Sequence, residues 1–260
     1  MKQGSLVKLE ITDLSSSGDG VGHREGLAIF IPDTVPGDRI FADITHRQRQ
    51  YVKGQIKELL QASPHRVRPR CIVANICGGC QWQHISDSYQ RQAKQQQVIS
   101  ALQRIGGFPE PPVAPLLFSE ATLGYRNKAT YPLGYSPTGK VQAGYYRIHT
   151  HHLINLNQCP VQDSRLNPLL TEVKQDIAAR GWTIYDETSH QGQLRHLALR
   201  IGRRTGEILL TLVSTDWDLP ALAEQAQAWR ERYPQIVGVC LNHNPRRTNT
   251  IFGKIGRAHV

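Results

Sequence analysis

Three of the five cysteines in this sequence lie within ten residues, and this cluster is the stretch best suited to chemistry. Cys71, Cys77 and Cys80 form the cluster, and the two glycines before Cys80 let the backbone wrap closely around a bound group. Cys159 lies far downstream, directly before a proline. The N-terminal residues run straight into a strand pattern and leave no room for a secretory leader, so metal binding is favoured over disulfides.

The spacing of these cysteines bears on which metal they would bind. Zinc ribbons usually supply four thiolates as two close pairs. Three local ligands and one remote ligand followed by proline are more typical of a cubane iron–sulfur cluster. The pattern therefore favours iron–sulfur over zinc, and either metal over unliganded thiols.

Composition points to a folded protein with an anionic partner. The 260 residues suffice for one large or two ordinary domains, and the formal net charge is +10. Such an excess favours nucleic acid or an anionic membrane surface. No apolar run is long enough to span a membrane and no basic amphipathic helix stands out, so we expect nucleic acid as the partner, no membrane association and a cytoplasmic location.

The first sixty residues read as a small β-barrel. Short strands alternate with glycine-rich turns, as in an OB-type Greek-key barrel, and are expected at about 6–11, 21–23, 27–31, 39–44 and 51–56. The loop before the last of these interleaves cations with an aromatic residue, namely Arg47, Arg49 and Tyr51. RNA contact and a merely solvated loop are both compatible with that pattern.

The remaining chain mixes helices and strands. A proline-punctuated basic linker (61–70) precedes the cysteines, and a helix is expected at 87–105. A basic, aromatic hairpin at 124–152 carries Arg126, Lys128, Lys140 and Arg147. Contact with RNA and cross-strand pairing of the aromatics are both compatible with this pattern, and each can hold for a different face. Further elements are expected at 167–180 (helix), 194–201 and 206–213 (antiparallel strands), 220–233 (helix) and 236–241 (strand).

Several motifs resemble known RNA-modifying enzymes. Residues 18–22, 30–32 and 36–38 look like the TRAM domain, an RNA-binding barrel. Nearly the whole chain resembles the S-adenosylmethionine-dependent RNA uracil-C5 methyltransferases, specifically their iron–sulfur ribosomal-RNA branch. Besides the TRAM motif, the resemblance rests on the cysteine stretch 70–81, on Tyr125-Arg126-Asn127-Lys128, on Gln158-Cys159-Pro160 and on Asn249-Thr250-Ile251-Phe252-Gly253.

The resemblance implies an α+β architecture. A five-stranded OB-like TRAM barrel (1–59) would precede a mixed α/β iron–sulfur domain (60–253), whose helix at about 87–105 would dock on a catalytic domain. Cys71, Cys77, Cys80 and Cys159 would hold a [4Fe-4S] cluster that is structural and shapes the RNA-binding surface. The tail 254–260 reads as non-native sequence.

Family members add a cysteine thiolate to uracil C6 so that C5 attacks the methyl group, and a base then removes the C5 proton. The Ser-Cys-Asn-Pro and Asp-Pro motifs that carry this chemistry have no match here, nor does a glycine-rich cofactor loop. We therefore expect the Rossmann-like methyltransferase domain to be absent, and the chain to be an inactive N-terminal part without catalytic or S-adenosylmethionine-binding residues.

The functional expectation is thus part of a monomeric 23S rRNA (uracil-C5)-methyltransferase, in which this part supplies RNA binding and a [4Fe-4S] cluster. S-adenosylmethionine would be the cofactor of the full-length protein only. Two alternatives remain: a stand-alone iron–sulfur or zinc RNA-binding adaptor, and an enzyme of the same class that acts on tRNA.

Overall fold

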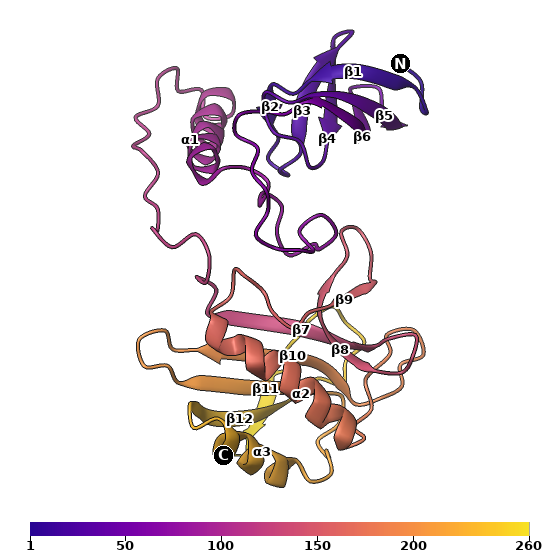
Figure 1. Cartoon of the computed structure of the whole chain (residues 1–260), viewed down its shortest axis with the longest axis vertical. Coiled ribbons are helices and arrows are strands. Elements are labelled where there is room, and N and C mark those ends of the chain that lie inside the picture. The colour runs from indigo at the N-terminus through magenta and orange to yellow at the C-terminus, as the bar shows by residue number, and fades with distance from the viewer. Residues whose placement is uncertain (260) are drawn as a thin grey trace. The chain divides into compact units, whose positions relative to one another are not determined.

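The computed structural model describes residues 1–259, which form two compact units (Figure 1). The barrel unit comprises residues 1–75 and 80–120. The sheet unit comprises residues 76–79 together with the chain from Ala121 onward. The boundary between the two units therefore differs from the predicted domain boundary after residue 59. The linker and the helix that follows the cysteines are grouped with the barrel.

The barrel unit is built on a six-stranded sheet with the order β1-β5-β6-β4-β3-β2. All neighbours are antiparallel except β4 and β6. Buried residues alternate along the strands, as in β5, where Ile40, Ala42 and Ile44 face the core. The strands are β1 (Leu6–Glu10), β2 (Asp13–Leu14), β3 (Gly20–Arg24), β4 (Leu27–Ile31), β5 (Arg39–Arg47) and β6 (Tyr51–Gln61).

The prediction of five strands was therefore one strand short. The additional strand, β2, has only two residues and pairs with β3. Gly22 in β3 lies against β1, and a Cβ atom there would come within 2.6 Å of the Glu10 carbonyl oxygen. The close approach of these two strands explains why glycine occupies this position.

The linker is anchored to the barrel by a buried ion pair. The Asp38 carboxylate accepts hydrogen bonds from the backbone N–H groups of Val35 (2.7 Å) and Ser63 (2.8 Å) and pairs with the guanidinium of Arg66. Burial by itself would raise the pKa of Asp38, but these hydrogen bonds outweigh it and hold the pKa below its ordinary value. The chain that leads to the cysteines is thus fixed to the barrel by one carboxylate.

Helix α1 (Asp87–Arg104) has the predicted extent and packs against the barrel by its N-terminal half. Tyr89 and Ala93 contact a small cluster formed by Leu14, Val35 and Ile85. Further along, the side-chain amide of Gln97 donates to the carbonyl of Ser15 at 3.1 Å. No residue of α1 is fully buried.

The sheet unit contains a seven-stranded sheet with the order β13-β12-β11-β10-β7-β8-β9. Its strands are antiparallel except β11 and β12, which α3 connects in parallel. The elements are β7 (Lys128–Tyr135), β8 (Val141–Tyr146), β9 (Leu153–Asn155), the 3-10 turn Ser164–Leu166, α2 (Asn167–Ala179), β10 (Leu194–Ile201), β11 (Ile208–Ser214), α3 (Leu222–Arg232), β12 (Ile236–His243) and β13 (Ile255–Ala258).

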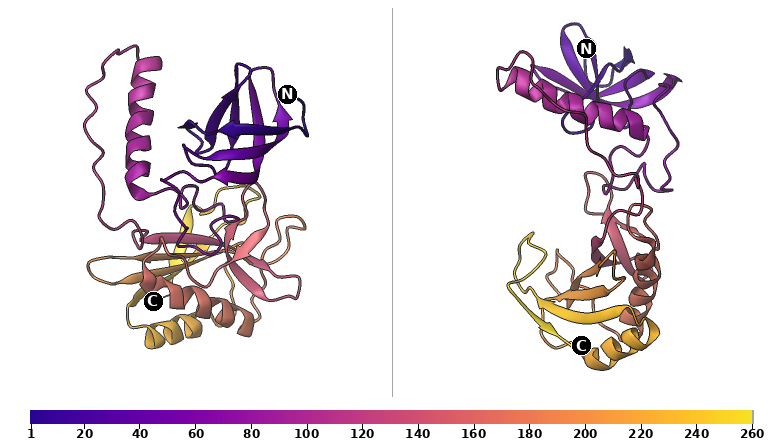
Figure 2. Two further views of the ribbon diagram at one scale, coloured as in Figure 1. Left: turned by 45° about the horizontal axis from the view of Figure 1, so that its top comes forward. Right: turned by 90° about the vertical axis from the view of Figure 1, so that its left-hand side faces the viewer.

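Helices α2 and α3 cover the same face of this sheet (Figures 1 and 2). Trp182 and Trp229, the latter a residue of α3, are buried with ring centroids 6.3 Å apart, and the indole N–H of Trp229 donates to Asp176 of α2 at 2.7 Å. Arg232 of α3 also pairs with Asp176. The described part of the chain contains no helix long and apolar enough to cross a membrane.

Candidate functional site

The part of the cysteine loop that contains Cys77 lies along the end of β8. The N–H of Gly78 donates to the carbonyl of Tyr146 at 2.9 Å, and the N–H of Ile148 donates to the carbonyl of Ile76 at 3.1 Å. These two hydrogen bonds fix residues 76–79 on the sheet unit and hold Cys77 in a buried position.

Gly79 lies in a crowded position that leaves little room for a side chain. A Cβ atom at this position would lie 3.3 Å from the Tyr145 ring and 3.4 Å from the Cys77 sulfur. Its backbone N–H points to the same sulfur, with a nitrogen–sulfur distance of 3.4 Å. N–H donors directed at a sulfur stabilise its thiolate form, which is the form that binds metal.

Cys159 is held by a polar network in the same unit. Its backbone N–H donates to the side-chain oxygen of Asn167 at 3.2 Å, and the Gln162 amide donates to that oxygen at 2.7 Å. The Tyr131 hydroxyl in turn donates to Gln162, which is 1% exposed. Asn167 was predicted only to open a helix, but it also positions this cysteine.

Tyr145 is a neighbour that Cys77 and Cys159 have in common. Burial raises the pKa of Tyr145, the Arg126 guanidinium opposes this rise, and a thiolate at Cys159 or at Cys77 would raise the pKa further, so both cysteines lie within electrostatic range of its hydroxyl. Arg126 donates to that hydroxyl at 3.0 Å. The half-buried guanidinium of Arg126 also interacts favourably with negative charge at Cys159.

Lys174 supports the segment that leads into Cys159. Its ammonium group is buried and donates to the side-chain oxygens of Asn155 (2.9 Å) and Asn157 (2.8 Å) and to the Leu156 carbonyl (2.7 Å). Burial lowers the pKa of Lys174 to about 8. Lys174 was not among the predicted site residues; the sequence signal for its buried role is its position in the apolar stripe of α2, between Leu170 and Ile177.

Replacement of Lys174 by methionine is expected to loosen this segment. Lys174→Met keeps roughly the side-chain length but removes the donor from the buried Leu156 carbonyl and from two partly buried asparagine oxygens, at a cost of about 2 kcal/mol in the free energy of unfolding. Urea denaturation of both proteins would measure it. Lys140→Met, in an exposed turn, is the control; equal stabilities for the two variants would show that the Lys174 contacts contribute nothing.

Cys71 and Cys80 belong to the barrel unit, whereas Cys77 and Cys159 belong to the sheet unit. Both barrel-unit cysteines are half-buried, and the N–H of Cys71 donates to Gln83 at 3.2 Å. Within residues 1–259, no three side chains of His, Cys, Asp or Glu are grouped closely enough to hold a metal ion. The structure thus brings Cys77 and Cys159 to one tyrosine, and a four-cysteine site stays a prediction.

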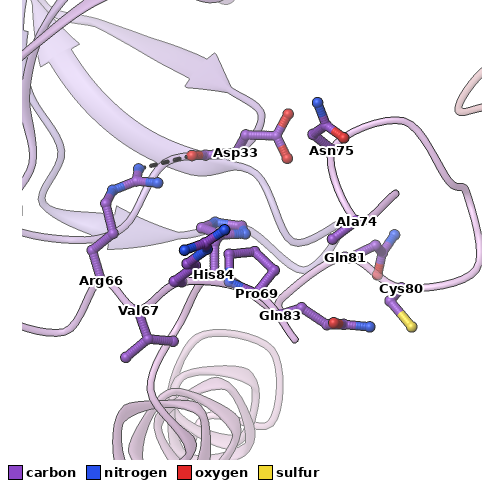
Figure 3. Close-up of a pocket in the computed structure, with 11 residues that line it drawn as sticks. Asp33, Arg66, Val67, Pro69, Ala74, Asn75, Cys80, Gln81, Gln83 and His84 are labelled. Carbon is purple, nitrogen blue, oxygen red and sulfur yellow. Dashed lines mark hydrogen bonds between the residues drawn. The ribbon is translucent and has the colours of Figure 1, made fainter. Parts of the chain in front are cut away.

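A cavity of about 410 Å³ lies in the barrel unit beside Cys80 (Figure 3). Arg66 extends along it and donates to the Asp33 carbonyl at 2.8 Å. Burial lowers the pKa of His84, and the Arg66 charge lowers it further, so the imidazole is neutral at pH 7. The cavity walls are rich in polar donors, namely Arg66, Arg68, Asn75, Gln81, Gln83 and His84.

The residues predicted to contact RNA lie in the barrel unit and in the sheet unit. Arg47, Arg49 and Tyr51 surround the β5–β6 hairpin turn, where the Gln48 N–H donates to the Tyr51 carbonyl at 2.9 Å. Both arginines are exposed, and the Tyr51 ring meets Phe30 edge-on with centroids 5.9 Å apart.

On the sheet unit, Lys140 and Arg147 are exposed at the two ends of β8. Lys128 is exposed at the start of β7, with its ammonium nitrogen 5.1 Å from the centre of the Phe252 ring. Arg126 differs from these because its half-buried guanidinium is bound to Tyr145 beside the cysteines. The contacts of all these residues with RNA remain predictions.

Cys240 is the fifth cysteine and a conceivable nucleophile. It lies in β12, partly buried, and burial raises the pKa of its thiol. A raised pKa keeps the thiol protonated at neutral pH and therefore unreactive.

Comparison with known proteins supports the family resemblance. Residues 1–57 match the TRAM domain, as predicted. The chain is 63% identical to an uncharacterized RNA methyltransferase of Nostoc sp. over 97% of its own length and 55% of the relative, and 58% identical to one of Synechocystis sp. over 97% and 54%. The chain spans about half the length of these curated relatives.

A solved structure shows the same fold. The Pyrococcus abyssi tRNA (uracil-54, C5)-methyltransferase in complex with S-adenosyl-L-homocysteine superposes with a TM-score of 0.68 at 23% identity, covering 96% of this chain and 55% of that one.

These similarities correct two expectations. The sequence predicted an architecture without the Rossmann-like methyltransferase domain, and for that reason a chain that is inactive. That prediction was wrong, because 96% of the chain superposes on a methyltransferase and 97% aligns with RNA methyltransferases. The elements that carry the cysteines and the cationic hairpin are thus part of a fold that RNA methyltransferases share, and the reason given for inactivity no longer holds.

Proposed function

We propose that this chain belongs to an S-adenosylmethionine-dependent RNA methyltransferase that modifies uracil C5 in 23S rRNA. The observation that carries the proposal is the alignment of 97% of the chain with an RNA methyltransferase at 63% identity. The TRAM match at residues 1–57 supports RNA as the partner, and the excess of cations agrees with it. Such an enzyme would act in the cytoplasm as a monomer.

The barrel and the cationic hairpin would bind and orient the RNA. Arg47 and Arg49 can contact phosphates from the β5–β6 turn, and Lys128, Lys140 and Arg147 can do so from the sheet unit. S-adenosylmethionine, when bound, supplies the electrophilic methyl group. The target uracil must be unstacked before its C5 can be reached, so a protein surface that holds the flanking nucleotides contributes directly to the reaction.

The four cysteines Cys71, Cys77, Cys80 and Cys159 are proposed to hold a [4Fe-4S] cluster. The donor set fits, since all-thiolate coordination is what such clusters use. The fixed Cys77 and Cys159 backbones and the N–H of Gly79 directed at the Cys77 sulfur support this proposal. In this role the cluster would stabilise the loop and the RNA-binding surface.

A tRNA substrate is the second candidate, because the similar solved structure is of a tRNA (uracil-54, C5)-methyltransferase. A test should use the protein as the source cell produces it, purified through a chromosomal tag. Incubated with methyl-labelled S-adenosylmethionine, it is expected to transfer label to unmodified 23S rRNA and not to unmodified tRNA. Label in tRNA alone would favour the second candidate, and label in neither RNA would favour an RNA-binding adaptor.

A further inference from the structure

A buried arginine in the sheet unit organises an irregular loop. Arg195 lies near the start of β10, at an irregularity in the β10–β11 register between Leu194 and His196. Its side chain is 3% exposed, which is exceptional for arginine. Bulges of this kind often redirect a side chain next to a functional site.

The Arg195 guanidinium is bound mainly by backbone carbonyl groups. One terminal nitrogen donates to the carbonyls of Asn244 (3.3 Å) and Arg246 (2.7 Å). The other donates to the Thr248 carbonyl (3.2 Å) and to the Glu187 carboxylate (2.8 Å). Three alternate carbonyls of the loop after β12 therefore point inward to a single side chain.

Asn244 continues this arrangement along the loop. Its side chain is 1% exposed, and its amide nitrogen donates to the carbonyls of Thr250 (2.6 Å) and Ile251 (2.9 Å). The backbone from Asn244 to Ile251 is thus held in one conformation without belonging to a helix or strand. When a loop fixed in this way binds a ligand through its outward side chains, ordering of its backbone costs no further conformational entropy.

The outward side chains of this loop are cationic. Arg246 and Arg247 are exposed, and neither forms an ion pair with any carboxylate in residues 1–259. Residues 244–253 contain these two arginines and no acidic residue. The Glu187 carboxylate, whose side chain is exposed, pairs with the buried Arg195 and so neutralises its charge, and the outer cations lack a counter-charge of their own.

More unpaired cations lie where the loop ends. Phe252 has the Lys128 ammonium 5.1 Å from its ring centre, and Lys128 is the direct cross-strand partner of Arg200. Both cations are exposed. Like charges directly opposite each other in a sheet repel, so this arrangement favours an anionic ligand that bridges them.

We infer that the loop 244–252 is an RNA phosphate-binding element, in which Arg246 and Arg247 contact the backbone of single-stranded RNA and Arg195 is the positioning residue. This inference rests on the proposed function, because the polyanion is taken to be the RNA substrate. It adds a binding element that lies outside both the TRAM barrel and the cationic hairpin.

The first test measures affinity and its salt dependence. With the full chain and a labelled single-stranded RNA of mixed sequence, each phosphate contact contributes about 0.7 to the slope of log affinity against log salt. Arg246→Gln/Arg247→Gln is expected to reduce the slope by about 1.4 and to weaken binding roughly 25-fold at about 0.1 M salt. Arg247→Gln alone is expected to show about half the change in slope.

Arg230→Gln is the matched control for Arg247→Gln. Arg230 is also an exposed arginine without an ion pair in the described chain, but it lies on α3, the layer that covers the other face of the sheet. If Arg230→Gln and Arg247→Gln change the slope equally, only general charge is involved and the inference is overturned. If the wild-type chain binds RNA and no variant alters its affinity, the inference fails but the proposed RNA binding stands. If the wild-type chain does not bind RNA at all, the proposed function is rejected.

The second test separates positioning from general stability. Arg195→Lys keeps the charge but cannot reach three carbonyls and a carboxylate together. It is expected to weaken RNA binding by roughly fivefold in the wild-type background. In the Arg246→Gln/Arg247→Gln background it is expected to have no further effect. A purely structural role for Arg195 would give the same loss in both backgrounds, which would contradict positioning.

Discussion

Replacement of Cys159 by serine is expected to abolish iron binding. In the proposed cluster, Cys159 is the one ligand that comes from outside the cysteine loop, and a neutral hydroxyl is a poor substitute for a thiolate. After anaerobic purification, the wild-type chain should show broad absorption near roughly 400 nm together with bound iron and sulfide. The variant should lose most of both.

Cys240→Ser provides the control, because Cys240 lies within β12 and is not part of the proposed ligand set. It should retain iron and absorption at wild-type levels. If the wild-type chain instead contains zinc and shows no such absorption, the four cysteines form a zinc site and not an iron–sulfur cluster. Unchanged iron content in Cys159→Ser would remove this residue from the ligand set altogether.

The second large effect is expected for Asp38→Asn, which should destabilise the barrel unit by about 3 kcal/mol. The asparagine keeps the size of the side chain but has one acceptor oxygen in place of two. It would leave the Arg66 guanidinium without its counter-charge and Val35 or Ser63 without an acceptor. Thermal and urea unfolding of the two proteins would measure the difference, with Asp33→Asn in the neighbouring exposed turn as the control.

The pH dependence offers an independent check on this ion pair. Because the folded-state pKa of Asp38 lies below its ordinary value of 3.8, its contribution to stability is fully present above that value. The contribution is lost as the pH falls through the lowered folded-state pKa. Asp38→Asn should therefore be less stable than wild type at neutral pH, and the difference should shrink on acidification. A constant difference across that range would contradict the linkage.

Local patterns predicted most of the elements, because strands and helices here carry clear periodicity. Ile40, Ala42 and Ile44 alternate as a half-buried strand requires, and Pro168 and Gly181 bracket α2 as helix boundaries do. The pairing of the strands was harder to predict from the sequence. The parallel contacts of β4 with β6 and of β11 with β12 join segments whose local sequences do not state their partners.

The polar residues that position the candidate sites were harder to predict. Arg195 lies in the strand segment Leu194–Leu199, and its position in the sequence predicts an ordinary strand residue. Nothing in the local pattern indicates that the strand has an irregularity here or that this side chain contacts the loop after β12. Lys174 and Asn167 act through oxygens and amides that are separated from them in sequence. Their roles follow from tertiary contacts, whereas the cysteine spacing was visible as a local motif.

The most direct test of the account is the 5-methyluridine content of 23S rRNA and of tRNA, measured by mass spectrometry in the source organism with and without this gene. We expect deletion to remove 5-methyluridine from 23S rRNA and to leave tRNA unchanged, and we expect reintroduction of the gene to restore the modification. Unaltered 5-methyluridine in 23S rRNA would contradict the account.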